Sequence, residues 1–163
     1  MRRIIDHFLL LWKQDSLRKP LLLRGARQVG KTHSVRQFGT SYDNFVEINL
    51  ELQTEAQHVF EKNLQPDRIM RELSLIAGQP IVPGKTLLFL DEIQAVPQAI
   101  IALRYFYELL PAQHVIAAGS LLDFAIEQVG IPVGRVQSLY MYPLSFVEYL
   151  VAIGERLIVE EIL

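Results

Sequence analysis

Short apolar runs alternate with amphipathic stretches along most of the 163-residue chain. Five of these runs are rich in aliphatic residues, and we predict that they form strands at residues 20–24, 45–49, 86–90, 114–118 and 136–142. The stretches around them carry apolar residues three and four positions apart, which predicts helices at residues 4–13, 31–38, 54–64, 67–77, 98–110 and 121–128. Strands that alternate with helices are typical of an α/β domain with a mainly parallel sheet.

The length of the chain fits one domain, and no repeat or flexible linker divides it. We expect an N-terminal helical segment at 1–19, a core at 20–152 and the start of a further helix at 153–163. Ser145 and Glu148 have the spacing of a capping box, which predicts a helix that begins after Ser145. The sequence ends within an amphipathic pattern, so a natural end and a truncated chain both remain open.

The composition narrows the class of protein. Half of the residues are apolar and 21% are charged, which excludes a disordered or low-complexity protein. No apolar run approaches the roughly 18 residues that a membrane-spanning helix needs. The chain has no cysteine, so disulfide scaffolds, thiolate catalysis and cysteine-ligated metals are excluded. These features lead us to expect a cytoplasmic protein without a membrane partner.

The strongest chemical signal is an eight-residue string that follows the first predicted strand and opens a predicted helix. The string matches the pattern G-x-x-x-x-G-K-[ST] and consists of Gly25, Ala26, Arg27, Gln28, Val29, Gly30, Lys31 and Thr32. Glycines at both ends let successive backbone N–H groups face phosphate oxygens, and the helix N-terminus adds partial positive charge. We therefore predict a nucleotide site in which Lys31 contacts the β- and γ-phosphates and Thr32 ligates Mg²⁺.

Two adjacent carboxylates, Asp91 and Glu92, follow the apolar strand predicted at 86–90. Ligands of open parallel sheets bind at the carboxyl ends of the strands, where the predicted phosphate loop also lies. We predict that Asp91 holds the hydration shell of Mg²⁺ and that Glu92 orients or deprotonates the water that attacks the γ-phosphate. Together with the loop, these carboxylates indicate a nucleotide-hydrolysing fold.

Two further polar residues each have two interpretations. Ser120 ends the fourth predicted strand, so it lies beside the γ-phosphate and the attacking water, or it caps the helix predicted from Leu121, and both roles can hold at once. Arg135 precedes the fifth predicted strand. It is either an arginine offered to the nucleotide of a neighbouring subunit or a partner in a surface salt bridge.

The charge of the chain is unevenly distributed. The net charge of −2 gives no overall electrostatic argument for nucleic-acid binding, but residues 1–36 contain nine Lys or Arg and two Asp, a balance of +7. Six of these basic residues form either a nucleic-acid patch or a solvated helix face with loop charges near ATP: Arg2, Arg3, Arg18, Lys19, Arg24 and Arg27.

Four strings resemble the N-terminal AAA-type ATPase domain of a large group of prokaryotic ATP-binding proteins: LLLRGARQVGKT, LLFLDEIQ, AAGSLLDFAI and VGRVQSLYMYPLSFVEYL. The resemblance covers about residues 8–152. It implies a P-loop NTPase fold, a three-layer α/β sandwich whose five-stranded sheet has the order 5-1-4-3-2. It also implies Mg-ATP as the ligand, a sensor role for Ser120 and an arginine-finger role for Arg135. Members of this group are usually more than twice as long as this chain.

These observations lead to two functional hypotheses. The first is a Mg-dependent ATPase that cleaves the β–γ phosphate bond, alone or as a homo-oligomer. The alternative is an ATP-binding switch with little hydrolysis that regulates a DNA or protein partner. Guanine specificity is disfavoured, because the chain contains no N/T-K-x-D string.

Overall fold

The centre of the molecule is a sheet of five parallel strands. The computed structural model describes residues 3–120, 122–130 and 132–162. The strand order is β2-β3-β4-β1-β5, which from the other edge is the predicted order 5-1-4-3-2. The strands are β1 (Leu21–Arg24), β2 (Asn44–Asn49), β3 (Thr86–Asp91), β4 (His114–Ala118) and β5 (Gln137–Tyr140). The prediction of an α/β fold with a parallel five-stranded sheet is therefore confirmed.

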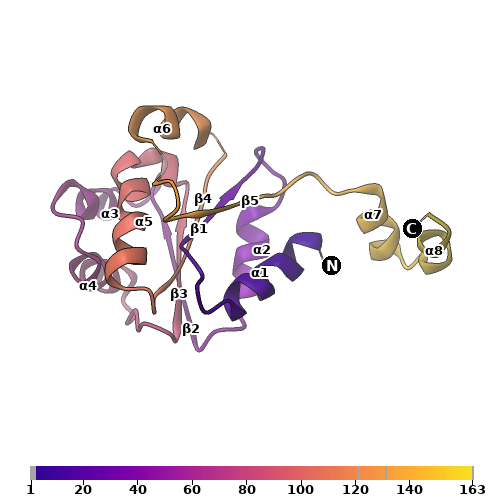
Figure 1. The fold of residues 1–163 in the computed structure, drawn as a ribbon, viewed down its shortest axis with the longest axis horizontal. Coiled ribbons are helices and arrows are strands. Elements are labelled where there is room, and N and C mark those ends of the chain that lie inside the picture. Colours follow the sequence, from indigo (N-terminus) through magenta and orange to yellow (C-terminus); the bar gives the residue numbers. More distant parts are fainter. Residues whose placement is uncertain (1–2, 121, 131, 163) are drawn as a thin grey trace.

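Helices cover both faces of this sheet, so the fold is a three-layer sandwich (Figure 1). One face carries α1 (Ile4–Gln14) and α2 (Lys31–Gly39). The other face carries α4 (Pro66–Ala77), α5 (Pro97–Leu109) and α6 (Leu122–Val129). The shorter elements are α3 (Thr54–Gln57) and the 3₁₀ turns η1 (His58–Glu61) and η2 (Ile93–Ala95). Within the described residues, no helix is long and apolar enough to cross a bilayer.

The sheet divides the core into two apolar layers because successive side chains of a strand point to opposite faces. In β1, Leu22 packs against the layer under α4 and α5, whereas Leu21 and Leu23 pack against the layer under α1 and α2. All residues of the central strands β3 and β4 are buried. Because both faces of these strands are covered by helices, their sequences are continuous apolar runs and do not alternate with polar residues.

The region predicted as one helix at 54–64 differs from the prediction. The α-helix ends at Gln57, and the 3₁₀ turn η1 follows. The backbone carbonyl of Val59 accepts a hydrogen bond of 2.7 Å from Arg68 of α4, so it is taken by a side chain from another element. Arg68 also bonds to the backbone of Asn63. This tertiary contact competes with continued helical bonding, and periodicity alone does not reveal it.

The last two helices, α7 (Phe146–Ile153) and α8 (Arg156–Ile162), extend beyond the edge of the sheet (Figure 1). The predicted capping box opens α7: Ser145 Oγ accepts from the Glu148 N–H at 3.2 Å, and Glu148 Oε2 accepts from the Ser145 N–H at 2.9 Å. Much of the apolar surface of α7 is exposed, including Phe146, Tyr149 and Val151. The buried residues of this helix are Glu148, in its first turn, and Leu150.

A buried histidine makes the stability of this fold sensitive to acid. His114 Nδ1 lies 2.7 Å from the Tyr42 hydroxyl, and burial, with smaller effects of Arg18 and Lys13, lowers the His114 pKa from 6.5 to about 4. The unfolded chain therefore takes up this proton before the folded chain does as the pH falls. We expect this group to reduce the free energy of unfolding by on the order of 2 kcal/mol between pH 6.5 and 4.

Urea unfolding at pH 7 and pH 4.5 measures this effect. The control is His114→Gln, whose side-chain oxygen accepts from Tyr42 but does not titrate in this range. The carboxylates of the chain contribute equally to the pH dependence of stability in both proteins. The variant should therefore lose less stability on acidification than the wild type. Equal losses in the two proteins would contradict the prediction.

Candidate functional site

The loop that joins β1 to α2 lies at the carboxyl edge of the sheet, and its backbone requires glycine at both ends. Gly25 has φ +143°, and a Cβ there would lie 2.2 Å from the backbone oxygen of Met141, which follows β5. Gly30 has φ +98° and precedes the first residue of α2. Gln28, with φ 65°, adopts a left-handed conformation that is uncommon for a residue with a side chain. Both glycines therefore adopt backbone angles that other residues resist.

Lys31 is the first residue of α2, and it is buried. Its Nζ donates hydrogen bonds of 2.8 Å to the backbone oxygens of Gly25 and Ala26. Burial lowers the pKa of Lys31, while the charges of Glu92 and Asp91 oppose this shift. The ammonium group is therefore held beneath the loop, beside two carboxylates.

Thr32 and Asp91 meet across the gap between the loop and β3. Thr32 Oγ1 donates to Asp91 Oδ2 at 3.0 Å. Burial raises the pKa of Asp91, and the hydrogen bond from Thr32 partly offsets this effect. A hydroxyl and a carboxylate held this close offer the oxygen ligands that Mg²⁺ prefers. The donor set at this point therefore fits a magnesium ion.

Glu92 stands at the end of β3 in a left-handed conformation, with φ 51°. Non-glycine residues rarely adopt such angles, and when they do the surrounding structure holds them there. Glu92 Oε2 accepts a hydrogen bond of 2.6 Å from Gln94 Nε2. Within the described part of the chain, the other amide atom, Gln94 Oε1, is buried without a hydrogen-bond partner. Gln94 thus fixes the Glu92 carboxylate, a role that the sequence analysis did not assign.

These groups line one cavity of about 180 Å³. Its walls combine loop, α2 and strand-end residues: Arg27, Gln28, Gly30, Lys31, Thr32, His33, Asp91, Glu92 and Ser120. An adjoining cavity of about 230 Å³ is lined by Gly25 and Ala26, and Ser120 lines it as well. The structure thus brings Ser120 next to the loop and the two carboxylates. Its proposed helix-capping role involves Leu121, which lies outside the described residues.

Arg135 lies at the amino edge of the sheet, opposite to the carboxyl edge where the loop lies. It precedes β5, and β5 runs parallel to β1 with Gln137 beside Leu21, at the amino end of both strands. The loop follows the carboxyl end of β1. Arg135 Nε donates to Glu108 Oε1 at 2.9 Å, and this contact lowers the Glu108 pKa. The salt bridge is therefore present, and a role toward a neighbouring subunit stays a prediction.

A comparison with protein families is consistent with this geometry. A family model described as an AAA domain matches residues 17–150. The chain belongs to the AAA-domain family. The resemblance inferred from the four strings is thereby confirmed. No curated protein matches the chain.

Solved structures share the fold of this AAA domain. A Walker-type ATPase from Pyrococcus abyssi has a TM-score of 0.56 and 18% sequence identity, covering 96% of this chain and 58% of that one. AMPPCP-bound DnaA from Aquifex aeolicus has a TM-score of 0.54 and 18% identity, covering 95% of this chain and 50% of that one. The AAA domain thus spans between half and three fifths of the length of these proteins.

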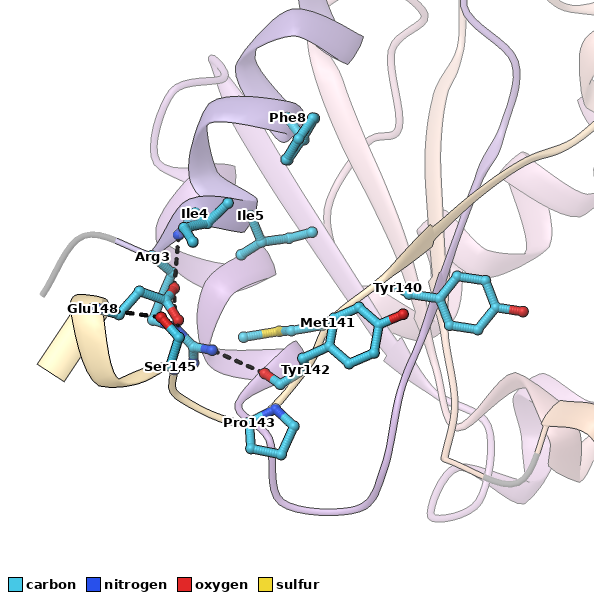
Figure 2. Close-up of a pocket in the computed structure, with 10 residues that line it drawn as sticks. All are labelled: Arg3, Ile4, Ile5, Phe8, Tyr140, Met141, Tyr142, Pro143, Ser145 and Glu148. Carbon is cyan, nitrogen blue, oxygen red and sulfur yellow. Dashed lines mark hydrogen bonds and ion pairs between the residues drawn. The ribbon is translucent and has the colours of Figure 1, made fainter. Parts of the chain in front are cut away.

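The AAA domain also contains an ion pair next to the loop that the sequence analysis missed. Arg3, interpreted there as one of six residues in a basic patch or solvated helix face, has an exposed side-chain fraction of only 11%. Its Nε donates to Glu148 Oε1 at 2.9 Å (Figure 2). For Arg3, the interpretation as part of a solvated helix face is wrong, because its side chain is mostly buried and bonds to Glu148 of α7. Arg2 lies outside the described residues.

Proposed function

We propose that this AAA domain binds Mg-ATP at the loop of residues 25–32 and hydrolyses the bond between its β- and γ-phosphates. One observation carries the proposal: a cation, a hydroxyl and two carboxylates line a single cavity at the end of β1 and β3. They are Lys31, Thr32, Asp91 and Glu92. This combination matches the requirements of phosphoryl transfer, in which a protein positions the phosphates and compensates their charge.

Binding uses the backbone of the loop and the start of α2. The loop N–H groups and the positive end of the helix face the phosphate oxygens. The Lys31 ammonium exchanges the carbonyls of Gly25 and Ala26 for oxygens of the β- and γ-phosphates. Thr32 and Asp91 would hold Mg²⁺, which when bound neutralises phosphate charge.

Hydrolysis requires a water placed in line with the bond that breaks. Glu92 accepts a proton from this water as the oxygen attacks the γ-phosphorus. The bond from that phosphorus to the bridging oxygen breaks, and ADP and inorganic phosphate are released. Gln94 occupies Oε2 of Glu92 through its amide, so we assign the water to Oε1. Ser120 lines the same cavity, and we assign it a contact with the γ-phosphate or the water.

The alternative is an ATP-binding switch that hydrolyses slowly and regulates a DNA or protein partner. One observation favours it: the +7 balance of residues 1–36. In that case nucleotide binding alone would change the surface offered to the partner. The two functions differ in the rate of phosphate release.

Thermal unfolding and phosphate release, measured on the same preparation, test the proposal. We expect Mg-ATP to raise the unfolding midpoint more than Mg-GTP does, and phosphate to appear with Mg-ATP but not after EDTA is added. A midpoint shift without phosphate release would favour the switch. Absence of both signals would overturn both functions.

A further inference from the structure

The guanidinium group of Arg3 joins three segments that are far apart in the sequence. NH1 donates to the backbone oxygen of Val29 at 3.2 Å, NH2 to the backbone oxygen of Tyr142 at 2.9 Å, and Nε to the Glu148 carboxylate. These acceptors belong to the phosphate loop, the segment after β5, and α7. Figure 2 shows Arg3 between Glu148 and the Tyr142 backbone, beneath the start of α1.

Glu148 fixes the guanidinium from the other side. Its Oε1 also accepts from the Ile4 N–H at 2.8 Å, and its Oε2 accepts from the Ser145 N–H. Burial acts to raise the pKa of Glu148, but hydrogen bonds from Ser145, Ile4 and Arg3 outweigh it and lower the pKa to about 2. Glu148 is therefore ionised at neutral pH. The exposed fractions of the Arg3 and Glu148 side chains are 11% and 8%.

The bond to Val29 matters because of the peptide that it orients. In a planar trans peptide, the carbonyl and the N–H of the next residue point in opposite directions. A Val29 carbonyl held toward Arg3 therefore aims the Gly30 N–H away from Arg3. Gly30 lines the candidate phosphate cavity. A Cβ at Gly30 would lie 3.5 Å from Met141 Cε and 3.8 Å from Arg3 NH1, so both side chains pack against the loop at this residue.

We propose that Arg3, held by Glu148, is a positioning residue for the phosphate-binding loop, and that it links nucleotide binding to the attachment of α7. The inference rests on the proposed function, because it assumes that the loop binds the phosphates. A loop whose Val29–Gly30 peptide is fixed in advance binds phosphate without the cost of ordering that peptide. Because coupling between two sites is reciprocal, bound nucleotide in turn strengthens the contact between the loop and α7.

The test compares nucleotide affinity in matched arginine variants. Arg3→Ala removes all three contacts, whereas Arg3→Lys keeps the charge near Glu148 but lacks the planar fork that reaches three acceptors. The control is Arg68→Ala. The side chain of Arg68 is 13% exposed, close to the value for Arg3, and it likewise pairs with a carboxylate, Glu72, and donates to a backbone carbonyl, that of Val59. Arg68 belongs to α4, on the opposite face of the sheet. Dissociation constants for Mg-ATP are measured by calorimetry below the unfolding transition of every variant.

We expect about tenfold weaker Mg-ATP binding in Arg3→Ala, and a loss in the same direction in Arg3→Lys, with Arg68→Ala equal to wild type. Hydrogen exchange supplies a second readout. Mg-ATP should slow exchange of the amides at 148–150 in the wild type, and this effect should be absent in Arg3→Lys. If Arg3→Ala does not fold, Arg3→Lys and the exchange measurement decide.

Three outcomes would overturn the inference. The first is that Arg3→Lys and Arg3→Ala bind Mg-ATP with the affinity of the wild type. The second is that Arg68→Ala loses as much affinity for Mg-ATP as the Arg3 variants do, which would indicate general destabilisation. Both leave the proposed function standing, provided that wild-type binding depends on Lys31. The third is that the affinity for Mg-ATP does not depend on Lys31. This result would overturn the proposed function together with the inference.

Discussion

Replacing Glu92 by Gln is expected to leave ATP binding intact and to lower the rate of phosphate release by about 100-fold or more. The amide has almost the shape of the carboxylate but does not accept a proton from the attacking water. The affinity should persist because Lys31, Thr32 and the loop backbone, which carry the binding, are unchanged. Phosphate release at saturating Mg-ATP gives the rate, and calorimetry gives the affinity.

The control for this substitution is Glu55→Gln, which makes the same chemical change at an exposed position on α3. Its phosphate release and affinity should both equal those of the wild type. Equal phosphate release in Glu92→Gln and wild type would contradict the role of Glu92 as the base. Loss of both affinity and turnover would instead assign Glu92 to nucleotide binding.

Replacing Lys31 by Ala is expected to abolish the stabilisation of the protein by Mg-ATP. Nucleotide at 100 times its dissociation constant adds about 2.7 kcal/mol to the free energy of unfolding, a shift of roughly 5–11 °C in the midpoint for a domain of this size. Without the ammonium group, the β- and γ-phosphates lose their main cationic partner in a site that contains Asp91 and Glu92.

Lys85→Ala is the matched control, because Lys85 is an exposed lysine beside the amino end of β3, at the far edge of the sheet. Its midpoint should rise with Mg-ATP as that of the wild type does. Nucleotide-free scans of each variant separate changes in the stability of the fold from changes in binding. A full midpoint shift in Lys31→Ala would place the nucleotide elsewhere.

The loop and the two carboxylates could be predicted from the sequence because each is encoded within a few consecutive residues. The glycine pattern defines the loop, and an apolar strand that ends in Asp91 and Glu92 places both at the carboxyl edge of the sheet. All five strands are parallel, so their carboxyl ends share one edge of the sheet, and Asp91 reaches Thr32 there although β4 lies between β3 and β1. Gln94, two positions after Glu92, was not assigned because its function depends on the direction of one amide group.

The pair formed by Arg3 and Glu148 could not be predicted in the same way. The two residues are 145 positions apart, and they meet only when β5 has joined the edge of the sheet beside β1. The capping-box spacing identified Glu148, but only in its local role toward Ser145. Arg3 stands in a basic segment whose other residues suggest solvent exposure. Its burial is a property of the assembled fold.

The position of Arg135 restricts the symmetry of any assembly in which it serves a second nucleotide. It lies at the amino edge of the sheet, whereas the phosphate loop lies at the carboxyl edge. A two-fold dimer uses the same surface patch on both copies, so that patch would have to contain Arg135 and the loop together. If the two belong to separate patches, contact between Arg135 of one copy and the loop of the next is head-to-tail. Repetition of such a contact produces a closed ring or an open helical filament.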